Sequence, residues 1–308
     1  MELIQLLSFY QIVKTGSFSK ASVKVFRSQS AVSHQIKKLE RDFNIKLFTR
    51  LGKRMVLTEE GKILFDVVSR VFNDLDNLKR IYADMEQGHS GSLVLASTSG
   101  IMTYWFSDFV NRFIIKFRSI KFKLIACDIY QMQELILNGE ADIGIGPQSH
   151  QLISEKINFV FWRSFDRVLL ANRSHPLSKK KNITYSDISK YPLILYRTGE
   201  TRKMIEDAFV KNNLSYEIIM EIDSTEIIKK FVKKGVGVSV VSSSLITNTE
   251  RRELFVSDVT KLFGQRSYGM YIMKDKYISA AMRQFIKFIT PELLDRLRPY
   301  KFQIPELH

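Results

Sequence analysis

The chain has 308 residues, too many for one small core, and this length indicates two or three domains. Hydrophobic residues make up 45% of it, which excludes wholesale disorder. The formal net charge is +15, of which residues 1–58 carry +8 because eleven Lys and Arg face three Asp and Glu there, and this favours a polyanionic partner for the N-terminal part.

The segment up to residue 25 predicts two short helices. The first ends near Gly16, and its apolar positions recur at steps of three and four: Leu3, Leu6, Tyr10 and Val13. The second begins after Ser17, whose hydroxyl is placed to cap it. Its apolar face is expected to hold Phe18, Ala21 and Val25.

A third helix and a hairpin follow. Ser28 is the expected N-cap of this helix, and its core positions are expected to be Val32, Ile36, Leu39 and Phe43. The sequence RLGKRMVL predicts a short hairpin with Gly52 at its tip. Three small helices and a hairpin make a winged helix-turn-helix module.

From Thr58 onward the pattern predicts one long helix without a proline, which Gly88 ends. A helix of about 28 residues would be roughly 42 Å long. Its apolar positions alternate steps of four and three as in a heptad seam: Leu64, Val68, Val71, Leu75, Leu78, Tyr82 and Met85. A seam this narrow favours pairing with the same helix of a second copy, and the alternative is packing against its own domain.

Beyond residue 90, strands alternate with helices. The expected strands contain SLVLAST, KFKLIAC, ADIGIG, DRVLLAN, EIIMEI and GVGVSVV. The expected helices cover Trp105–Phe117, Gln131–Leu137, Thr201–Asn212 and Ser224–Lys234. This alternation predicts a mostly parallel sheet with right-handed crossovers, in a region long enough for two lobes.

The order of these parts and their local sequences resemble those of the LysR-type transcriptional regulators. The stretch GSFSKASVKVFRSQSAVSHQIKKLERDFNIKLFTR is similar to that family's DNA-binding signature, and LNGEADIGIG, LLANRSHPL and KKFVKKGVGVSVVSSSLI are similar to its effector domain. The stretches YPLILYRTGETRKMIEDAF and FITPELLDRL look most like the branch that activates cysteine and sulfur-assimilation genes.

The resemblance implies an N-terminal all-α winged helix-turn-helix with a long linker helix, followed by a C-terminal α/β domain with two lobes, like a periplasmic binding protein. We expect a DNA-binding domain over residues 1–58, a dimerisation helix over 59–88 and an effector-binding domain over 89–308. Within the last, the first lobe is expected to take about residues 91–162 and 267–308, and the second about 163–266.

The third helix is the expected DNA-reading element, because its core face leaves a polar face outward. Recognition helices touch base edges with their N-terminal turns, and a glutamine can pair bidentately with adenine. The expected base-reading residues are Ser28, Gln29, Ser30, Ser33 and His34. The expected phosphate contacts, which fix register, are Lys37, Lys38 and Arg41 on the helix and Arg50, Lys53 and Arg54 on the wing. The alternative is an ordinary solvated helix face.

A ligand site is expected where ASTSG joins the end of a strand to a helix start, because such a junction favours an anion. In the resembled family this turn lines a cleft between two lobes, which implies these effector-binding residues: Thr98, Ser99, Gln148, Thr198, Thr201 and Arg202. An N-cap role is the alternative for each Ser and Thr. A small carboxylate, an acetylated amino acid, sulfate and a more apolar effector all remain open.

Other classes of function fit the sequence poorly. The five histidines form no catalytic or metal-binding pattern, no G-x-S-x-G occurs, and Cys127, the only cysteine, ends an apolar strand. We therefore expect no enzyme activity, no cofactor and no metal. A solute-binding receptor would leave the basic N-terminal module unexplained, whereas a constitutive DNA-binding protein without an effector is the more serious alternative.

The expected location is the cytoplasm. A single cysteine indicates a reducing compartment, MELIQLLSFY lacks the basic segment of a secretion signal, and no apolar run approaches the roughly 20 residues of a membrane span. The expected partners are double-stranded DNA, a small-molecule effector, RNA polymerase and further copies of this chain in a dimer or tetramer, with no membrane partner.

Overall fold

The computed structural model describes residues 1–51, 54–87, 91–149, 152–274 and 276–297. Its contacts divide the chain into two compact units, of which one holds residues 1–88 with the short segment Leu137–Glu140, and the other holds the rest. The first unit contains a helical head and a long helix, and the second contains two lobes.

The head forms three helices and a hairpin: α1 (Leu3–Thr15), α2 (Phe18–Lys24), α3 (Gln29–Phe43), β1 (Phe48–Leu51) and β2 (Arg54–Leu57). The predicted boundaries are confirmed by their caps. Gly16 ends α1 in the left-handed region at φ 64°, which a glycine adopts without strain. The hydroxyls of Ser17 and Ser28 accept the backbone N–H groups of Lys20 and Ala31 at 3.3 and 3.2 Å. β1 and β2 pair antiparallel up to Leu51 and Arg54, and the predicted tip at Gly52 lies outside the described residues.

The head core corrects two expected core positions. The buried side chains come from all three helices, the hairpin approach and α4 (Glu59–Gln87): Leu6, Phe9, Ile12, Ala21, Val25, Val32, Ile36, Leu39, Leu47 and Val68. Leu3 is 55% exposed and Phe43 is 44% exposed, so both predictions were wrong. Each lies in a terminal turn of its helix, and a residue there follows the right period but extends past the partner helices that would cover it.

The long helix α4 spans Glu59–Gln87 as the heptad pattern predicts, although the seam has two environments. Leu64 and Val68 pack against the head core. Val71, Leu75 and Leu78 are 39%, 37% and 43% exposed. The side chains of Tyr82 and Met85, and the predicted stop at Gly88, lie outside the described residues. The N-terminal part of the seam therefore packs within its own domain, whereas the middle part is partly exposed.

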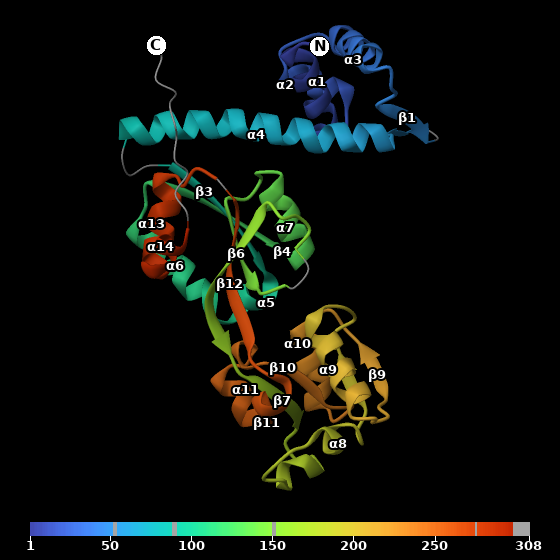
Figure 1. Cartoon of the computed structure of the whole chain (residues 1–308), viewed down its shortest axis with the longest axis vertical. Helices are drawn as coiled ribbons and strands as arrows, with labels where there is room; N and C mark the ends of the chain where they lie inside the picture. Colours follow the sequence, from blue (N-terminus) through green and yellow to red (C-terminus); the bar gives the residue numbers. More distant parts are fainter. Residues whose placement is uncertain (52–53, 88–90, 150–151, 275, 298–308) are drawn as a thin grey trace. The chain divides into compact units, whose positions relative to one another are not determined.

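Lobe I is built on a five-stranded sheet of order β4-β3-β5-β12-β6 (Figure 1). Its strands are β3 (Gly91–Thr98), β4 (Ile120–Cys127), β5 (Ile143–Pro147), β6 (Ile157–Phe165) and β12 (Arg266–Met273). Its helices are α5 (Ser99–Ile101), η1 (Met102–Phe106), α6 (Ser107–Lys116), α7 (Ile129–Leu137), α13 (Ala280–Ile289) and α14 (Glu292–Arg296). Figure 1 shows α6, α13 and α14 together on one side of the sheet and α7 on the other. The helix expected from Trp105 instead starts directly after β3 and passes through the π-helical turn η1.

Lobe II contains a three-stranded sheet of order β10-β7-β11 and the pair β8-β9. Its strands are β7 (Arg167–Asn172), β8 (Leu193–Leu195), β9 (Ile218–Glu221), β10 (Ser239–Ser242) and β11 (Leu254–Asp258). Its helices are η2 (Pro176–Lys179), α8 (Tyr185–Ile188), α9 (Glu200–Lys211), α10 (Thr225–Lys233), η3 (Ser243–Leu245), α11 (Asn248–Glu253) and α12 (Thr260–Phe263).

The expectation of mostly parallel sheets was wrong in part. β3 pairs parallel with β4 and β5, and β8 pairs parallel with β9. β12 pairs antiparallel with β5 and β6, and β7 pairs antiparallel with β10 and β11. The reason is that β6 continues into β7 and the chain returns from β11 into β12, so each lobe receives a strand that runs against its neighbours (Figure 1).

Candidate nucleic-acid interface and effector site

The outward face of α3 carries the residues expected to read bases. Gln29, Ser30 and His34 are exposed, Ser33 is half-buried, and Val32, Ile36 and Leu39 on the opposite face are buried in the head core. Because only the inner face is packed, the polar face is free to approach a partner closely. This is the arrangement by which recognition helices enter a major groove.

Local hydrogen bonds hold the start of this face in place. The Ser19 hydroxyl, on α2, donates to Oε1 of Gln29 at 2.9 Å, and the hydroxyls of Ser28 and Ser30 lie 2.9 Å apart. Ser19 was not singled out from the sequence. The signal that could have found it is that the N-terminal turn of α3 must lie near α2 in any tight helix-turn-helix.

The turn between α2 and α3 has an unusual conformation. Phe26 has a φ of 54°, in the left-handed region that large side chains rarely adopt, and its side chain is 90% exposed. Arg27 beside it is exposed as well. An aromatic and a cationic side chain therefore flank the start of the recognition helix, and the sequence analysis assigned neither a role.

The expected phosphate-binding cations differ in their availability. Lys37, Arg41 and Arg50 are exposed. Lys38 instead forms a 2.6 Å ion pair with Glu2, and this hydrogen bond raises the pKa of the Lys38 ammonium and lowers that of the Glu2 carboxyl. Lys53 lies outside the described residues, as does the side chain of Arg54, whose backbone belongs to β2. A glutamate near the chain start thus competes for one of the expected contacts.

The strand–helix turn of lobe I forms where the sequence predicts it. β3 ends at Thr98, whose hydroxyl makes no capping bond, and Ser99 opens the following helix with its carbonyl accepting from the Thr103 hydroxyl at 2.9 Å. Gln148 follows β5, where its backbone N–H donates to the Ser267 carbonyl at 2.8 Å. Because β3 and β5 are neighbours in the sheet, both predicted segments end at one edge of it.

Thr201 lies against a residue that the sequence analysis missed. Nη1 of Arg167 donates to the Thr201 hydroxyl at 3.2 Å. Arg167 opens β7 and is only 4% exposed, and its Nε is buried without a hydrogen-bond partner among the described residues. Burial, together with the nearby positive charge of Arg266, lowers the pKa of this guanidinium to about 10.

The other two predicted residues of lobe II lie differently. Thr198 is exposed ahead of α9. Arg202 forms ion pairs with Glu206 at 3.0 Å and with Glu221 at 2.5 Å, and it donates to the Arg197 carbonyl at 3.0 Å. Its charge is therefore already balanced within the lobe, and no hydrogen bond in the described part of the chain joins it to Arg167.

A second set of polar side chains surrounds Arg167. Arg266, at the start of β12, forms an ion pair with Glu200 at the start of α9. The buried hydroxyls of Ser244 and Tyr268 lie 3.3 Å apart. The Tyr196 hydroxyl lies 2.7 Å from that of Thr225, and burial raises its pKa to about 12. These groups come from both lobes and from the strands between them, so we call this cluster the lobe junction.

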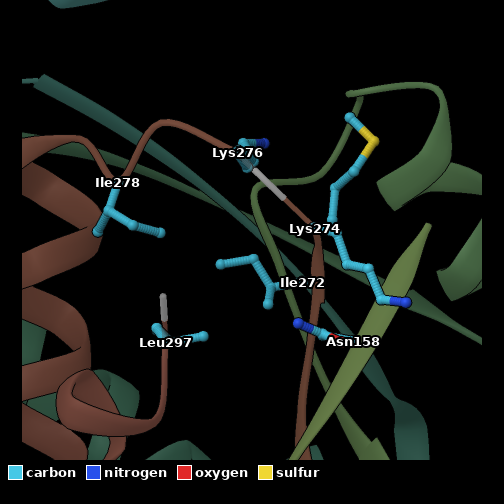
Figure 2. A pocket seen from close by; sticks show the side chains of 7 residues that line it. Asn158, Ile272, Lys274, Lys276, Ile278 and Leu297 are labelled. Atoms are coloured by element: carbon cyan, nitrogen blue, oxygen red, sulfur yellow. The ribbon is translucent and has the colours of Figure 1, made fainter. Parts of the chain in front are cut away.

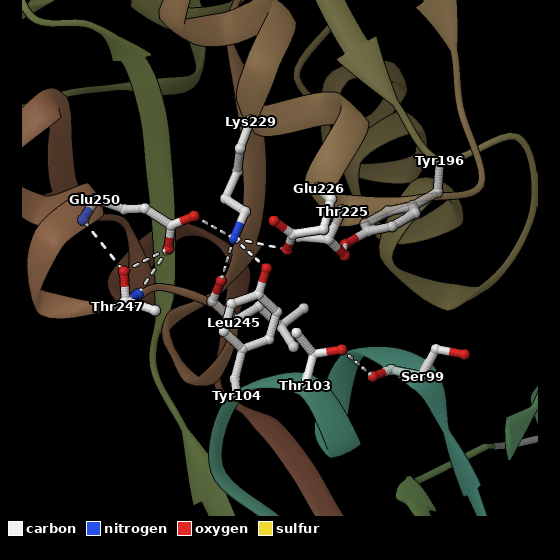
Figure 3. A network of polar contacts seen from close by, with 10 residues as sticks. All are labelled: Ser99, Thr103, Tyr104, Tyr196, Thr225, Glu226, Lys229, Leu245, Thr247 and Glu250. Atoms are coloured by element: carbon white, nitrogen blue, oxygen red, sulfur yellow. Dashed lines mark hydrogen bonds and ion pairs between the residues drawn. The ribbon is translucent and has the colours of Figure 1, made fainter. Parts of the chain in front are cut away.

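Lys229 joins the lobes next to this cluster (Figure 3). Its ammonium extends from α10 and bonds the Tyr104 hydroxyl of lobe I and the Leu245 carbonyl, the latter at 3.1 Å. It also forms ion pairs with Glu226 at 2.9 Å and Glu250 at 2.6 Å. Burial would raise the pKa of the Glu250 carboxyl, but hydrogen bonds from Lys229 and Thr247 lower it. The sequence carries no local signal for this contact, whose partners lie far apart along the chain.

A cavity of about 350 Å³ lies elsewhere in lobe I (Figure 2). It is lined by Asn158, Ile272, Met273, Lys274, Lys276, Ile278 and Leu297. None of the predicted effector residues line it, and its buried Lys276 is neutralised by a 3.0 Å ion pair with Asp142. The polar side chains of the lobe junction therefore make it a better candidate effector site than this cavity, whatever the volume of the cavity.

The described part of the chain shows neither a cluster of metal ligands nor a membrane-spanning helix. It holds no group of three or more His, Cys, Asp or Glu side chains arranged to bind a metal ion. None of its helices combines the length and hydrophobicity of a membrane span.

Comparison with known proteins gives matches over nearly the whole chain. Residues 3–62 match the family described as "Bacterial regulatory helix-turn-helix protein, lysR family", and residues 86–294 match the "LysR substrate binding domain". The HTH-type transcriptional regulator cbl of Escherichia coli (strain K12) is 32% identical over 78% of this chain and 76% of its own length. The HTH-type transcriptional regulator CysB of Burkholderia cenocepacia is 26% identical over 91% and 90%.

The fold has a match of similar extent among solved structures. A substituted, full-length form of OxyR from Pseudomonas aeruginosa superposes with a TM-score of 0.72 over 99% of both chains at 17% sequence identity. The predicted fold class and the resemblance to the cysteine and sulfur-assimilation branch are confirmed by these matches.

Proposed function

Because this chain belongs to the LysR family of bacterial helix-turn-helix regulators, we propose that it binds promoter DNA as a dimer or tetramer and responds to an effector at the lobe junction. It is a transcriptional regulator with an effector-binding domain, and members of this family are not enzymes. The observation that carries the proposal is the polar outer face of α3, uncovered above a packed inner face in the most basic part of the chain.

On DNA, α3 lies in the major groove and reads base edges through Gln29, Ser30, Ser33 and His34, with Ser28 as its cap. The exposed Lys37 and Arg50, and the wing residues Lys53 and Arg54, neutralise phosphates. Lys38 contributes only where a phosphate displaces Glu2. This division follows from exposure and from side-chain length: short polar groups permit close approach, whereas long cations reach the backbone.

A dimer follows from α4, on which Val71, Leu75 and Leu78 form an apolar stripe that is 37–43% exposed. Two such stripes bury each other in a coiled coil, which places two heads on half-sites in successive major grooves. In this proposal residues 1–58 bind DNA, 59–88 pair the copies and 89–308 hold the effector. The proposal also includes assembly into tetramers and contact with RNA polymerase. These take place in the cytoplasm, where bacterial promoters lie.

The effector-binding residues are Thr98, Ser99 and Gln148 from lobe I and Thr198 and Thr201 from lobe II. Arg202 is a supporting residue, because Glu206 and Glu221 occupy its charge. An effector that binds one arrangement of the lobes better than another shifts its population and with it the affinity for DNA. The regulated genes are expected to belong to cysteine or sulfur metabolism, as in the similar branch of the family.

The test is DNase footprinting of the purified protein on the region upstream of its own gene, with and without sulfur metabolites. We expect a protected region of two half-sites separated by whole helical turns, and a changed footprint with one of the metabolites. Equal affinity for this region and for random DNA would refute the proposal. A footprint that no metabolite alters would favour a constitutive regulator without an effector.

A further inference from the structure

Arg167 is a buried cation without an acidic partner. Its side chain is 4% exposed, its Nε has no hydrogen-bond partner, and no ion pair in the described part of the chain includes it. Its backbone is held firmly, because its N–H donates to the Thr260 hydroxyl at 3.0 Å and its carbonyl accepts the N–H of Val259 at 2.9 Å. A guanidinium that is desolvated and fixed without a counter-ion is unfavourable, which points to an anion as its missing partner.

The other buried cations differ from Arg167 in this respect. Lys229 has Glu226 and Glu250, and Lys276 has Asp142. Of the half-buried cations near Arg167, Arg202 has Glu206 and Glu221. Arg266 has Glu200. Among the described residues, the other two fully buried cations, Lys229 and Lys276, are therefore each paired with a carboxylate, and Arg167 at the lobe junction is the exception.

The groups near Arg167 set the charge of the missing partner. Arg266 and Glu200 are the fully charged side chains that act on its guanidinium, and they neutralise each other. Two guanidinium groups against one carboxylate leave one positive charge. A ligand with one negative charge would balance the cluster, whereas a neutral ligand would leave the charge uncompensated.

The surroundings also supply hydrogen bonds for such a ligand. Thr201 lies in the first turn of α9, and Gly199 caps this helix without a side-chain hydrogen bond. The first N–H groups of a helix lack intrahelical partners and favour an anion. Ser242 is the register partner of Arg167 on β10 and brings a hydroxyl to the adjacent strand position.

We propose that the effector is a singly charged anion, and that Arg167 binds its charge through Nε while the Thr201 hydroxyl and the first N–H groups of α9 donate hydrogen bonds to it. This inference rests on the effector function proposed above and deepens it, because it names the charge of the ligand and the residue that selects it. Arg167 is the residue that discriminates between charged and neutral effectors.

Isothermal titration calorimetry on the full-length protein tests this with probes of matched size. N-acetylglycine carries one negative charge, N-acetylglycinamide is its neutral counterpart, and sulfate carries two charges. We expect the wild-type protein to bind N-acetylglycine and not N-acetylglycinamide. We expect Arg167→Gln to bind N-acetylglycine about 30-fold or more weakly, since truncating one partner of a buried charge pair has an effect of this size.

Arg251→Gln is the matched control, because it removes an exposed arginine of the same lobe, on α11. It should change the affinity for N-acetylglycine by less than about threefold. Equal binding of the neutral and charged probes, no binding of N-acetylglycine, or a larger loss in Arg251→Gln than in Arg167→Gln would each overturn the proposal. Tighter binding of sulfate than of N-acetylglycine would overturn the inference that the effector carries a single negative charge.

The melting temperature of Arg167→Met distinguishes a ligand-binding role of Arg167 from a structural role. If Arg167 awaits a ligand, this substitution removes an uncompensated charge, so the melting temperature of the ligand-free protein stays the same or rises while anion binding is lost. A lower melting temperature would assign Arg167 to the fold instead. DNA binding is measured separately by anisotropy, so failure of the head to bind DNA would refute the proposed function without touching the calorimetric result.

Discussion

The outer face of α3 and the lobe junction both present polar side chains to a proposed partner, but they do so in opposite ways. The residues of α3 follow one another along a single helix, and most are exposed. Arg167, Thr201, Ser242 and Arg266 of the junction come from four separate segments, and Arg167 is buried. Affinity at the first surface is a sum of weak, solvated contacts, whereas at the second a single unpaired charge dominates.

The difference teaches how strongly each surface depends on its surroundings. Exposed cations on the head are screened by salt, and each contributes a small, similar amount to DNA binding. Charges in the junction are shielded from water, so each must be balanced locally by Glu200, Glu226, Glu250 or a ligand. Each substitution of a head cation should therefore have a small, similar effect, whereas a single substitution of a charge in the junction should have a large one.

The largest effect is expected within the head itself, from the boundary between packed and exposed residues on α3. Leu39→Ala should lower the free energy of unfolding by about 2–5 kcal/mol, because it leaves a cavity in the core. Phe43→Ala should lower it by less than about 1 kcal/mol, since Phe43 is already 44% exposed. Urea denaturation measures both. Similar losses for the two would contradict the exposed position of Phe43.

Beside the lobe junction, Lys229→Met should lower the free energy of unfolding by about 3 kcal/mol, because it leaves the Glu226 and Glu250 carboxylates without the cation that they share. Lys230→Met on the same helix is the control, since Lys230 is exposed, and it should change stability by less than about 0.5 kcal/mol. Calorimetric melting of both variants gives the comparison. An equal response would remove the contrast between buried and surface charges.

On the reading face, Gln29→Ala should cost about 1–3 kcal/mol of binding on the cognate site and little on random DNA. Fluorescence anisotropy with both duplexes measures the difference. Ser19→Ala, which removes only the hydroxyl that bonds Gln29, should have a smaller effect of the same kind. Gln131→Ala on α7 is the control for an exposed glutamine. Loss of affinity on both duplexes alike would show that Gln29 does not read sequence.

A smaller effect is expected from the phosphate contacts. Lys37→Ala should weaken binding to every duplex and reduce the slope of log affinity against log salt by about one. The matched variant Lys211→Ala, an exposed helical lysine of lobe II, should leave the slope unchanged. Anisotropy titrations over a range of salt concentrations test both. If Lys37→Ala leaves this slope unchanged, Lys37 does not contact a phosphate.

The smallest effect is expected on how stability changes at acidic pH. A hydrogen bond from Lys180 and two from Thr184 lower the pKa of Asp187 below its usual 3.8. A lowered pKa stabilises the fold above the unfolded value, so this contribution is present at neutral pH and is lost as the pH falls below about 4. Asp187→Asn should lower stability at pH 7 by less than about 1 kcal/mol and by less again at pH 3. Asp207→Asn, at an exposed site, should show no such pH dependence.

The sequence predicts the head almost completely because its determinants are local. The caps at Ser17 and Ser28, the left-handed Gly16 and the hairpin all form as expected, since each needs only a few neighbouring residues. The errors at Leu3 and Phe43 lie at helix ends, where the period continues but the partner helices do not. The Glu2–Lys38 ion pair was not predicted, because it depends on how α1 packs against α3.

For the second unit, the sequence by itself determined where strands and helices alternate and which family the chain resembles. Only the tertiary structure decided the direction of β12 and β7, the ion pair of Arg202 with Glu221, and the isolation of Arg167. The physical reason is that hydrophobic period and capping act over a few residues, whereas charge balance in a buried site depends on side chains that the fold brings together from distant segments.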